Sequence, residues 1–133
     1  MLKVHHVGIW VRDLGRSGRF YQEVMGFQKQ YDYQIPAELV RRIFGPETGC
    51  RVEVYHQDEV NLELFHPDQK MPQHHPHPLS PAINHFGLKV GDKRVFCREA
   101  EGRGAQIIEV AREDHSVYFV RDPDGILIEI KDK

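Results

Sequence analysis

The 133-residue sequence has little of several features that would narrow its function at once. It contains only two cysteines, Cys50 and Cys97, too few for the disulfide framework of a small secreted domain, so we expect reduced thiols and a cytoplasmic location. No apolar run approaches the roughly 20 residues that a membrane-spanning helix needs, and the start lacks the apolar stretch of a secretory signal. The formal net charge of −2 supplies no basic field for nucleic acid or an anionic membrane. These absences argue against nucleic-acid and membrane partners.

Histidine, by contrast, is plentiful, with nine residues, and two of them mark an internal repeat. When His6 is aligned with His85, both copies read H-x-G-Φ-x-V-x-D, where Φ is Ile or Leu. In each copy the apolar residues alternate as in a half-buried strand. Asp13 and Asp92, which end the two copies, are suitable N-caps for helices that follow. The repeat therefore predicts a strand and a helix at the start of each half.

Both halves continue with three more predicted strands, so each half reads β-α-β-β-β. A short helix is predicted in the first half between Pro36 and Gly45-Pro46, and residues 67–81 hold five of the eight prolines. The sequence thus predicts one α+β domain, residues 1–133, made of two tandem βαβββ modules. Their predicted bounds are about 1–66 and about 82–133, with a proline-rich linker at 67–81. The six later strands are predicted at 26–33, 51–57, 61–67, 105–112, 116–122 and 126–132.

Strand alternation places one histidine and one glutamate of each module on the same sheet face. Side chains i and i+2 share a face, so His6 lies opposite the aliphatic residues of its strand, and Glu63 lies opposite Leu62 and Leu64. The same holds for His85 and Glu129 in the second half. The aliphatic face must pack beneath the module's helix, which leaves both polar pairs on the other side.

Two imidazoles and two carboxylates on such faces indicate a divalent cation site, because these groups are its natural ligands and the ion offsets the cost of burying charge. A single strand histidine is usually an ordinary half-buried side chain, and an edge-strand glutamate is usually solvated. The repeat raises the weight of the metal hypothesis, since it places the same two residue types at equivalent points twice.

The sequence resembles the vicinal oxygen chelate superfamily, which comprises glyoxalase, bleomycin-resistance and extradiol-dioxygenase proteins. The resemblance rests on "HHVGIWVRDLGRSGRFYQEVMGF", "NLELFHP", "INHFGLKV" and "VYFVRDPDGILIEI". It implies two modules whose curved mixed sheet surrounds a metal-binding cleft, with ligands on the first and last strands of each module. Those positions are His6, Glu63, His85 and Glu129. It also implies a homodimer, in which modules pair either within a chain or across subunits.

The resemblance further implies a metal-dependent lyase or isomerase that stabilises an enediolate-type anion from a small molecule with vicinal oxygens. The ligand set is most similar to that of glyoxalase I, followed by methylmalonyl-CoA epimerase. Glu129 and Glu63 are the implied proton-transfer carboxylates. The implied cofactor is one divalent cation, whose identity among zinc, nickel, cobalt, manganese and iron stays open because His and Glu ligands suit all of them. The alternatives are a ring-cleaving dioxygenase and a non-catalytic ligand-binding or resistance protein.

One departure concerns the substrate. Typical glyoxalase I carries an arginine four residues after the first ligand, where this sequence has Trp10. We therefore expect Trp10 to favour an aromatic or apolar substrate part and Lys89 to meet an anionic group.

Several residues near the predicted site carry weaker expectations. Gly8 and Gly87 are expected to leave open space over the metal, and His5 is interpreted as structural. A second metal site at His74, His75 and His77 is less favoured than a flexible loop. Arg51, Glu53 and Tyr55 are expected on the cavity side of their strand.

Overall fold

The fold is described from a computed structural model, which describes residues 1–73 and 79–133. The loop hypothesis for His74, His75 and His77 lies outside these residues. The chain divides into two compact units, Met1–Gln22 with Gly26–His75, and Glu23–Met25 with Pro76–Lys133. None of the helices in the described ranges has the length and apolar character that crossing a membrane requires.

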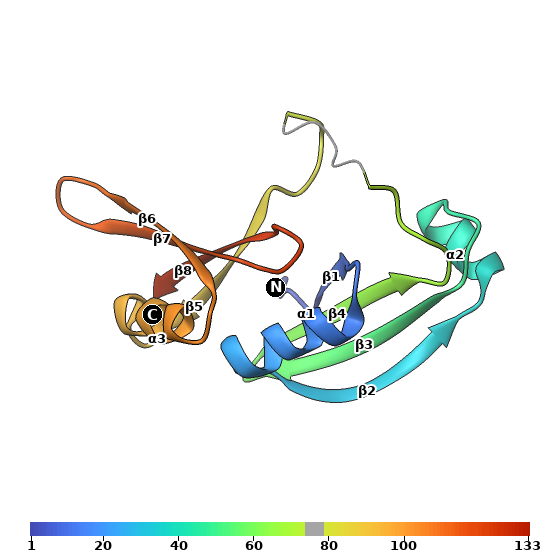
Figure 1. The fold of residues 1–133 in the computed structure, drawn as a ribbon, viewed down its shortest axis with the longest axis horizontal. Coiled ribbons are helices and arrows are strands. Elements are labelled where there is room, and N and C mark those ends of the chain that lie inside the picture. Colours follow the sequence, from blue (N-terminus) through green and yellow to red (C-terminus); the bar gives the residue numbers. More distant parts are fainter. Residues whose placement is uncertain (74–78) are drawn as a thin grey trace. The chain divides into compact units, whose positions relative to one another are not determined.

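The first module is a four-stranded mixed sheet in the order β1-β4-β3-β2 (Figure 1). The first and last strands in sequence, β1 and β4, are parallel neighbours, whereas the other pairs are antiparallel. Its elements are β1 (Val7–Trp10), α1 (Leu14–Arg19) with its π-helical continuation η1 (Phe20–Val24), β2 (Gln28–Ile35), α2 (Ala37–Phe44), β3 (Cys50–Gln57) and β4 (Val60–Pro67).

Local sequence signals set the ends of these elements. The Asp13 carboxylate accepts a hydrogen bond from the Arg16 amide and caps α1. The inserted helix α2 begins after Pro36 and ends at Gly45, whose φ of 104° is open to glycine alone among common residues. The predicted insertion helix is therefore present. Strand β4 ends at Pro67, where the predicted strand 61–67 also ends.

The sheet of the first module buries side chains on both faces. Leu62 and Leu64 of β4 are almost fully buried on the face that α1 covers, together with Tyr55 of β3. The opposite face carries a second apolar cluster built from three strands and α2. Its members are Ile35, Val40, Cys50, Val52, Val54 and Phe65, with Trp10 packed against them.

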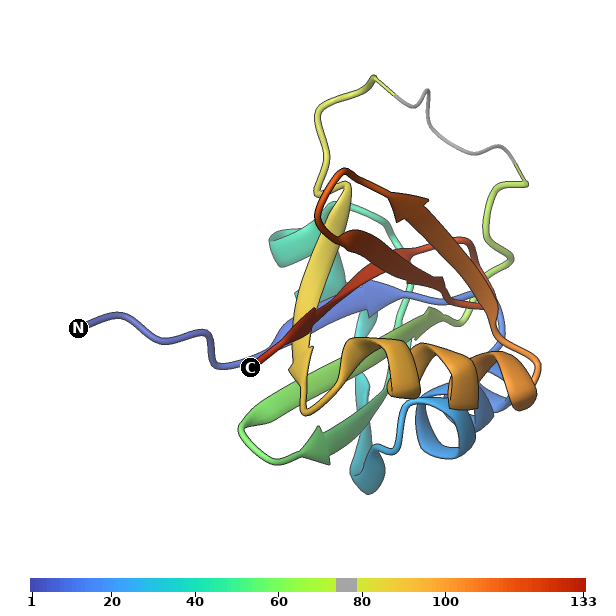
Figure 2. The ribbon, with the colours of Figure 1, turned by 90° about the vertical axis from the view of Figure 1, so that its left-hand side faces the viewer.

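The second module repeats this topology with the order β5-β8-β7-β6. The helix lies along one face of the sheet (Figure 2) and is capped by the Asp92 carboxylate, which accepts from the Val95 amide. The turn "DPDG", residues 122–125, is held by Asp122, whose carboxylate accepts from the amides of Asp124 and Ile126 at 2.9 and 2.8 Å. The elements are β5 (His85–Val90), α3 (Lys93–Gly102), β6 (Gln106–Ala111), β7 (Ser116–Arg121) and β8 (Leu127–Asp132).

The predicted fold class is confirmed. Two four-stranded mixed sheets, each with one parallel pair and helices, form an α+β protein of two βαβββ modules. In both modules the parallel pairing brings the first strand beside the last one. This pairing positions the candidate site.

Candidate metal-binding half-sites

The first half-site lies where β1 meets β4. Gly8 is the register partner of Glu63, and His6 directly precedes β1. The His6 Nε2 is 2.8 Å from the Glu63 Oε2, with side-chain exposures of 47% and 16%. A half-buried carboxylate therefore faces an imidazole that solvent reaches, as an accessible metal site requires.

A tyrosine from β2 contacts the second oxygen of this carboxylate. Tyr33 is opposite Val52 in the register, on the same face as Glu63, and its hydroxyl donates to the Glu63 Oε1 at 3.3 Å. Burial and the neighbouring carboxylate raise the pKa of Tyr33, so the hydroxyl remains a donor. Tyr33 thus holds Oε1 while Oε2 faces His6. The ring of Tyr33 stacks with that of Tyr31 at a centroid distance of 6.2 Å.

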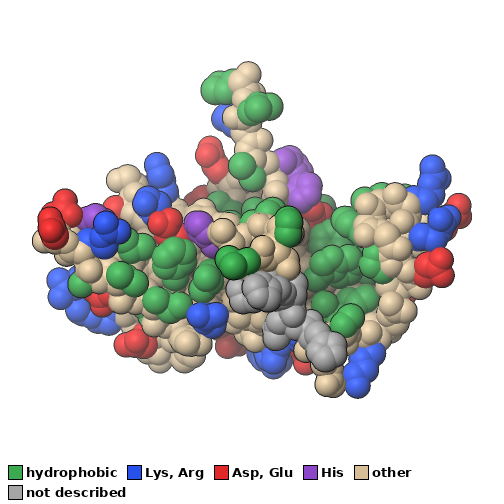
Figure 3. Space-filling view, turned by 90° about the horizontal axis from the view of Figure 1, so that it is seen from above, with side chains coloured by type: hydrophobic (Ala, Val, Ile, Leu, Met, Phe, Trp, Pro, Cys, Tyr) green, Lys and Arg blue, Asp and Glu red, His purple; other side chains and the backbone are tan. Residues whose placement is uncertain are grey.

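An open cavity of about 330 Å³ surrounds the first half-site. Histidine side chains reach the surface beside acidic and hydrophobic ones in the view of Figure 3. The cavity leaves room for a small molecule next to the carboxylate. It is lined by His5, His6, Gln30, Tyr31, Val54, His56, Asn61 and Glu63.

The second half-site repeats the arrangement between β5 and β8. Gly87 is the register partner of Glu129, and the His85 Nε2 is 3.9 Å from the Glu129 Oε2. The other oxygen, Oε1, is 3.5 Å from the Lys131 Nζ. The ring of Phe119, opposite Glu129 on β7, meets the His85 ring edge-on at 5.5 Å. The carboxylate is held more loosely than Glu63.

The residue before each histidine contacts its Nδ1 atom. The His5 Nδ1 is 2.9 Å from the His6 Nδ1, and the Asn84 Oδ1 is 2.5 Å from the His85 Nδ1. With a cation bound, each ligand candidate would carry its proton on Nδ1, toward these neighbours, and would offer the Nε2 lone pair to the ion. Such outer partners fix the orientation of metal-binding histidines. His5, which the sequence analysis interprets as structural, lines the same cavity as His6.

The structure therefore forms two His–Glu pairs from the four predicted ligands. Within residues 1–73 and 79–133, no group of three or more His, Cys, Asp and Glu side chains is placed to hold a metal ion. The donors nevertheless fit a divalent cation, because ligands about 2.1 Å from one ion lie about 3.0 Å apart at right angles and about 4.2 Å apart when opposed. The separations of 2.8 and 3.9 Å lie close to this range.

The expectation that Arg51, Glu53 and Tyr55 lie on the cavity side of their strand is wrong. Arg51, Glu53 and Tyr55 lie on the helix side of β3, since Val52 and Val54 are the residues opposite Phe65 and Glu63. The phase of this strand is set by burying Tyr55, which is 1% exposed. Alternation separates these two sets of side chains but does not say which set faces the helix, because this sheet buries side chains on both faces.

The expected space over Gly8 is also not open. A Cβ atom there would lie 3.1 Å from the Phe65 ring, whereas at Gly87 the nearest atom is a backbone oxygen at 3.8 Å. The ring of Trp10 packs edge-on against the rings of Phe44 and Phe65, each at a centroid distance of 5.7 Å, and those two rings lie 5.5 Å from each other. Trp10 also lines a cavity of about 180 Å³ with Met71 and Pro72. The glycine repeat therefore serves packing in one module and leaves space in the other.

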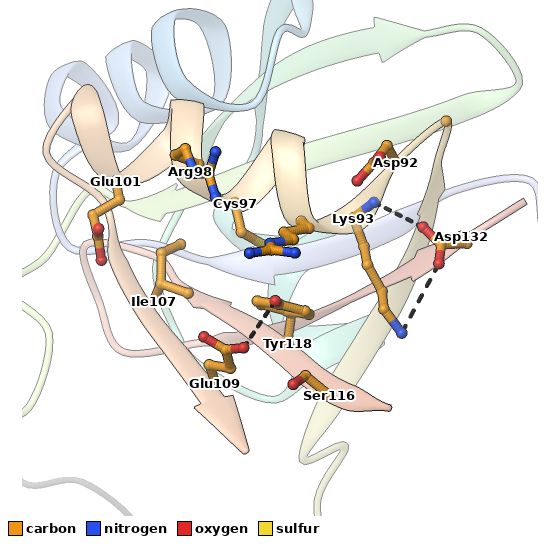
Figure 4. A pocket seen from close by; sticks show the side chains of 12 residues that line it. Asp92, Lys93, Cys97, Arg98, Glu101, Ile107, Glu109, Ser116, Tyr118 and Asp132 are labelled. Atoms are coloured by element: carbon orange, nitrogen blue, oxygen red, sulfur yellow. Dashed lines mark hydrogen bonds and ion pairs between the residues drawn. The ribbon is translucent and has the colours of Figure 1, made fainter. Parts of the chain in front are cut away.

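A cavity of about 750 Å³ in the second module is lined by α3 and by the sheet face that carries Tyr118 (Figure 4). His85 and Glu129 lie on the opposite face of this sheet. Between α3 and the strands, the Tyr118 hydroxyl donates to Glu109 at 2.9 Å. Cys97, at its wall, is 2% exposed, and burial raises the pKa of its thiol to about 11. This cavity contains none of the predicted ligands.

Comparison with known proteins identifies the family. A family model described as the Glyoxalase/Bleomycin resistance protein/Dioxygenase superfamily matches residues 3–130. The chain belongs to this superfamily. Among curated proteins, it is 26% identical to a probable lactoylglutathione lyase of Vibrio parahaemolyticus over 141 aligned positions, covering 96% of this chain and 88% of the relative.

Solved structures of this superfamily have the same fold. The glyoxalase family protein from Enterococcus faecalis superposes with a TM-score of 0.75 at 21% identity, covering 96% of this chain and 95% of that one. The trypanothione-dependent glyoxalase I of Leishmania major gives 0.72 at 23% identity, covering 99% and 87%. At these identities the similarity shows the fold alone.

Proposed function

We propose that this superfamily member is a divalent-metal-dependent lyase or isomerase of the glyoxalase type. The observation that carries the proposal is the repeated pair of a histidine Nε2 and a glutamate carboxylate, at 2.8 Å in one module and 3.9 Å in the other. Similarity to a probable lactoylglutathione lyase over most of the chain supports this reaction class. The proposed ligands are His6 and Glu63 from the first module and His85 and Glu129 from the second.

The proposed ligands differ in how firmly they are held. Tyr33 donates to one oxygen of Glu63, and His5 fixes the ring of His6, so the first half-site is preorganised. When bound, the cation supplies Lewis-acid stabilisation for negative charge that develops on vicinal oxygens of the substrate. Its identity among zinc, nickel, cobalt, manganese and iron is not dictated by His and Glu ligands.

Glu129 is the proposed proton-transfer carboxylate. Its contacts to His85 and Lys131 are 3.9 and 3.5 Å, longer than hydrogen bonds. A carboxylate without a close hydrogen bond can move toward a substrate C–H bond and accept its proton. Glu63, which Tyr33 holds, has less freedom for this role. We therefore assign the base to Glu129 and a holding role to Glu63.

The first test is the metal content of protein purified without added metal, measured by inductively coupled plasma mass spectrometry. One equivalent of a divalent cation per proposed site is expected, with loss in His6→Ala and in His85→Ala. A metal-free protein that takes up no cation on titration would contradict the proposal and favour a ligand-binding protein without catalysis.

A second experiment asks which modules share a site, since members of this superfamily are commonly homodimers. His6→Ala and His85→Ala proteins are mixed, unfolded and refolded together. If one site draws ligands from two chains, the mixture regains one intact site per heterodimer, which a metal assay detects. If each chain forms its own site, no metal binding returns.

The reaction itself is tested in heavy water. Small α-hydroxyketones and 2-oxo acids, which present adjacent oxygens, are incubated with metal-loaded protein, and exchange of the carbon-bound proton is followed by NMR. Exchange is expected to require Glu129. In Glu129→Gln, the rate of proton exchange should therefore fall by a larger factor than the metal content does. Oxygen consumption with a catechol would instead indicate a dioxygenase.

A further inference from the structure

The face of the second module that carries His85 and Glu129 is rich in positive charge. The strand register places three cationic residues on this face, Lys89 of β5, Arg121 of β7 and Lys131 of β8. Among the strand positions of this face in the described residues, Glu129 is the one carboxylate. The face therefore has positive charge in excess of what its own carboxylate neutralises.

Arg121 is the cation whose surroundings are unusual. Within residues 1–73 and 79–133, its Nε is buried without a hydrogen-bond partner and its guanidinium forms no ion pair with a carboxylate. Buried donors in folded proteins are nearly always paired. A buried donor without an acceptor on the face of a candidate site indicates that a bound molecule supplies the acceptor.

The register also gives the distance from Arg121 to the candidate ligands. Arg121 is opposite Leu127 on β8, which is opposite His85 on β5. Two strand spacings separate the Cα atoms of Arg121 and His85, about 10 Å. Phe119 lies two residues from Arg121 on the same face, beside the His85 ring. Leu127 thus lies between Arg121 and His85 in the register, and Phe119 extends this apolar surface beside Glu129.

We propose that the substrate is a small organic acid whose carboxylate pairs with Arg121 while its apolar body lies on Phe119. This inference rests on the proposed function, which places the vicinal oxygens of the same molecule at His85 and Glu129. A guanidinium binds a carboxylate through two parallel hydrogen bonds, and Nε is one of the donors that such a pair uses. Lys89 and Lys131 supply attraction for the anion from the other side of Glu129.

The test compares two probes in metal-free protein, so that no carboxylate can bind through a cation. Phenylacetate carries an aromatic ring and a carboxylate, and phenylacetamide is its neutral isostere. Binding is measured by ligand-observed NMR or calorimetry. Wild-type protein is expected to bind phenylacetate at least about tenfold more tightly than phenylacetamide, and Arg121→Met is expected to lose this preference.

Arg98→Met is the matched control, because Arg98 lines the cavity on the α3 side of the sheet. It should keep the preference for phenylacetate. If Arg121→Met also keeps it, or if wild-type protein shows no preference, the inference is wrong. Arg121→Lys, which keeps the charge, should show an intermediate preference and guards against a folding defect in the methionine variant.

Metal titration of the same variants separates this inference from the proposed function. Arg121→Met should bind a divalent cation as wild-type protein does, since Arg121 is not among the proposed ligands. Loss of the phenylacetate preference with normal metal binding supports both proposals. A preference that persists in a protein unable to bind metal overturns the proposed function and leaves the anion site standing.

Discussion

The Nε2 of His6 and the Oε2 of Glu63 lie 2.8 Å apart, although the two residues stand at opposite ends of the first module's sequence. Parallel pairing of β1 with β4 brings them together. The second module repeats this pairing, with His85 and Glu129 at 3.9 Å. The same two residue types thus meet twice for the same topological reason, which is the basis of the following predictions.

Glu63→Gln should weaken divalent-cation binding more than the roughly 10- to 100-fold typical of an outer-partner mutation, because it removes the charge of a proposed ligand. The amide retains the size of the side chain, so the fold should persist. Competition with a chromogenic chelator measures the affinity. Glu59→Gln, in the β3–β4 turn, is the matched control and should bind as wild-type protein does.

His5→Ala and Asn84→Ala should each lower cation affinity by about 10- to 100-fold, since each removes the partner of a ligand histidine's Nδ1. The loss should be smaller than in His6→Ala or His85→Ala. The same competition assay ranks all four variants. Unchanged affinity in both His5→Ala and Asn84→Ala would show that these contacts do not orient the ligands.

Tyr33→Phe should weaken cation binding by up to about tenfold, because it removes one hydrogen bond to a charged group. The ring and its stacking on Tyr31 are kept. Tyr31→Phe is the control, as no contact from the Tyr31 hydroxyl to Glu63 is present in the described residues. Equal cation affinities of the two variants would show that the Tyr33 hydroxyl does not contribute to the half-site.

The sequence predicted the two modules, the helix caps and the pairing of each histidine with its glutamate, because these depend on repetition and on strand alternation. It did not predict the face of β3, where Tyr55 is buried and Val54 faces the site. Alternation cannot tell which set of side chains in a strand faces the helix when both faces of the sheet are buried. The contacts of Tyr33 and Arg121 depend on strand order and register, which are non-local.

One signal for the outer partners was available in the sequence. His5 and Asn84 occupy equivalent positions in the repeat, and both side chains can bind an imidazole Nδ1. The dipeptides His5-His6 and Asn84-His85 therefore have a common explanation in the structure. Comparing the residues that flank each candidate ligand would have identified them.

Cys97 should resist thiol reagents at pH 8 in the folded protein. Burial raises the pKa of its thiol to about 11, so the reactive thiolate is scarce. Labelling with a disulfide reagent should be at least about 100-fold slower than in urea, measured by mass spectrometry of the Cys97 peptide. Rapid labelling without denaturant would contradict its burial.

The same pKa shift makes stability depend on pH. The thiol has a higher pKa in the folded protein than in the unfolded chain. Its contribution to the free energy of unfolding is therefore complete below about pH 8.5 and is lost as the pH rises toward about 11. Urea unfolding between pH 8 and 10.5 should show a decline that is smaller in Cys97→Ala. An equal slope in both proteins would assign the decline to other groups.

Asp92→Ala should lower the free energy of unfolding by about 1 kcal/mol, because the carboxylate caps α3 through the Val95 amide. Asp92→Asn, which can still accept this hydrogen bond, should lose only part of that amount. Urea denaturation followed by circular dichroism measures both. A full loss in Asp92→Asn would point to a role for the charge rather than the cap.

The parallel β1–β4 and β5–β8 pairs have a consequence for folding. An ion held by His6 and Glu63 fastens the first strand of a module to its last, and thereby closes nearly the whole module into a loop. Such a metal cross-link removes conformational freedom from the unfolded chain, and the free energy of metal binding adds to the stability of the folded protein. Chelation of an ion held in this way should therefore lower the melting temperature of the protein.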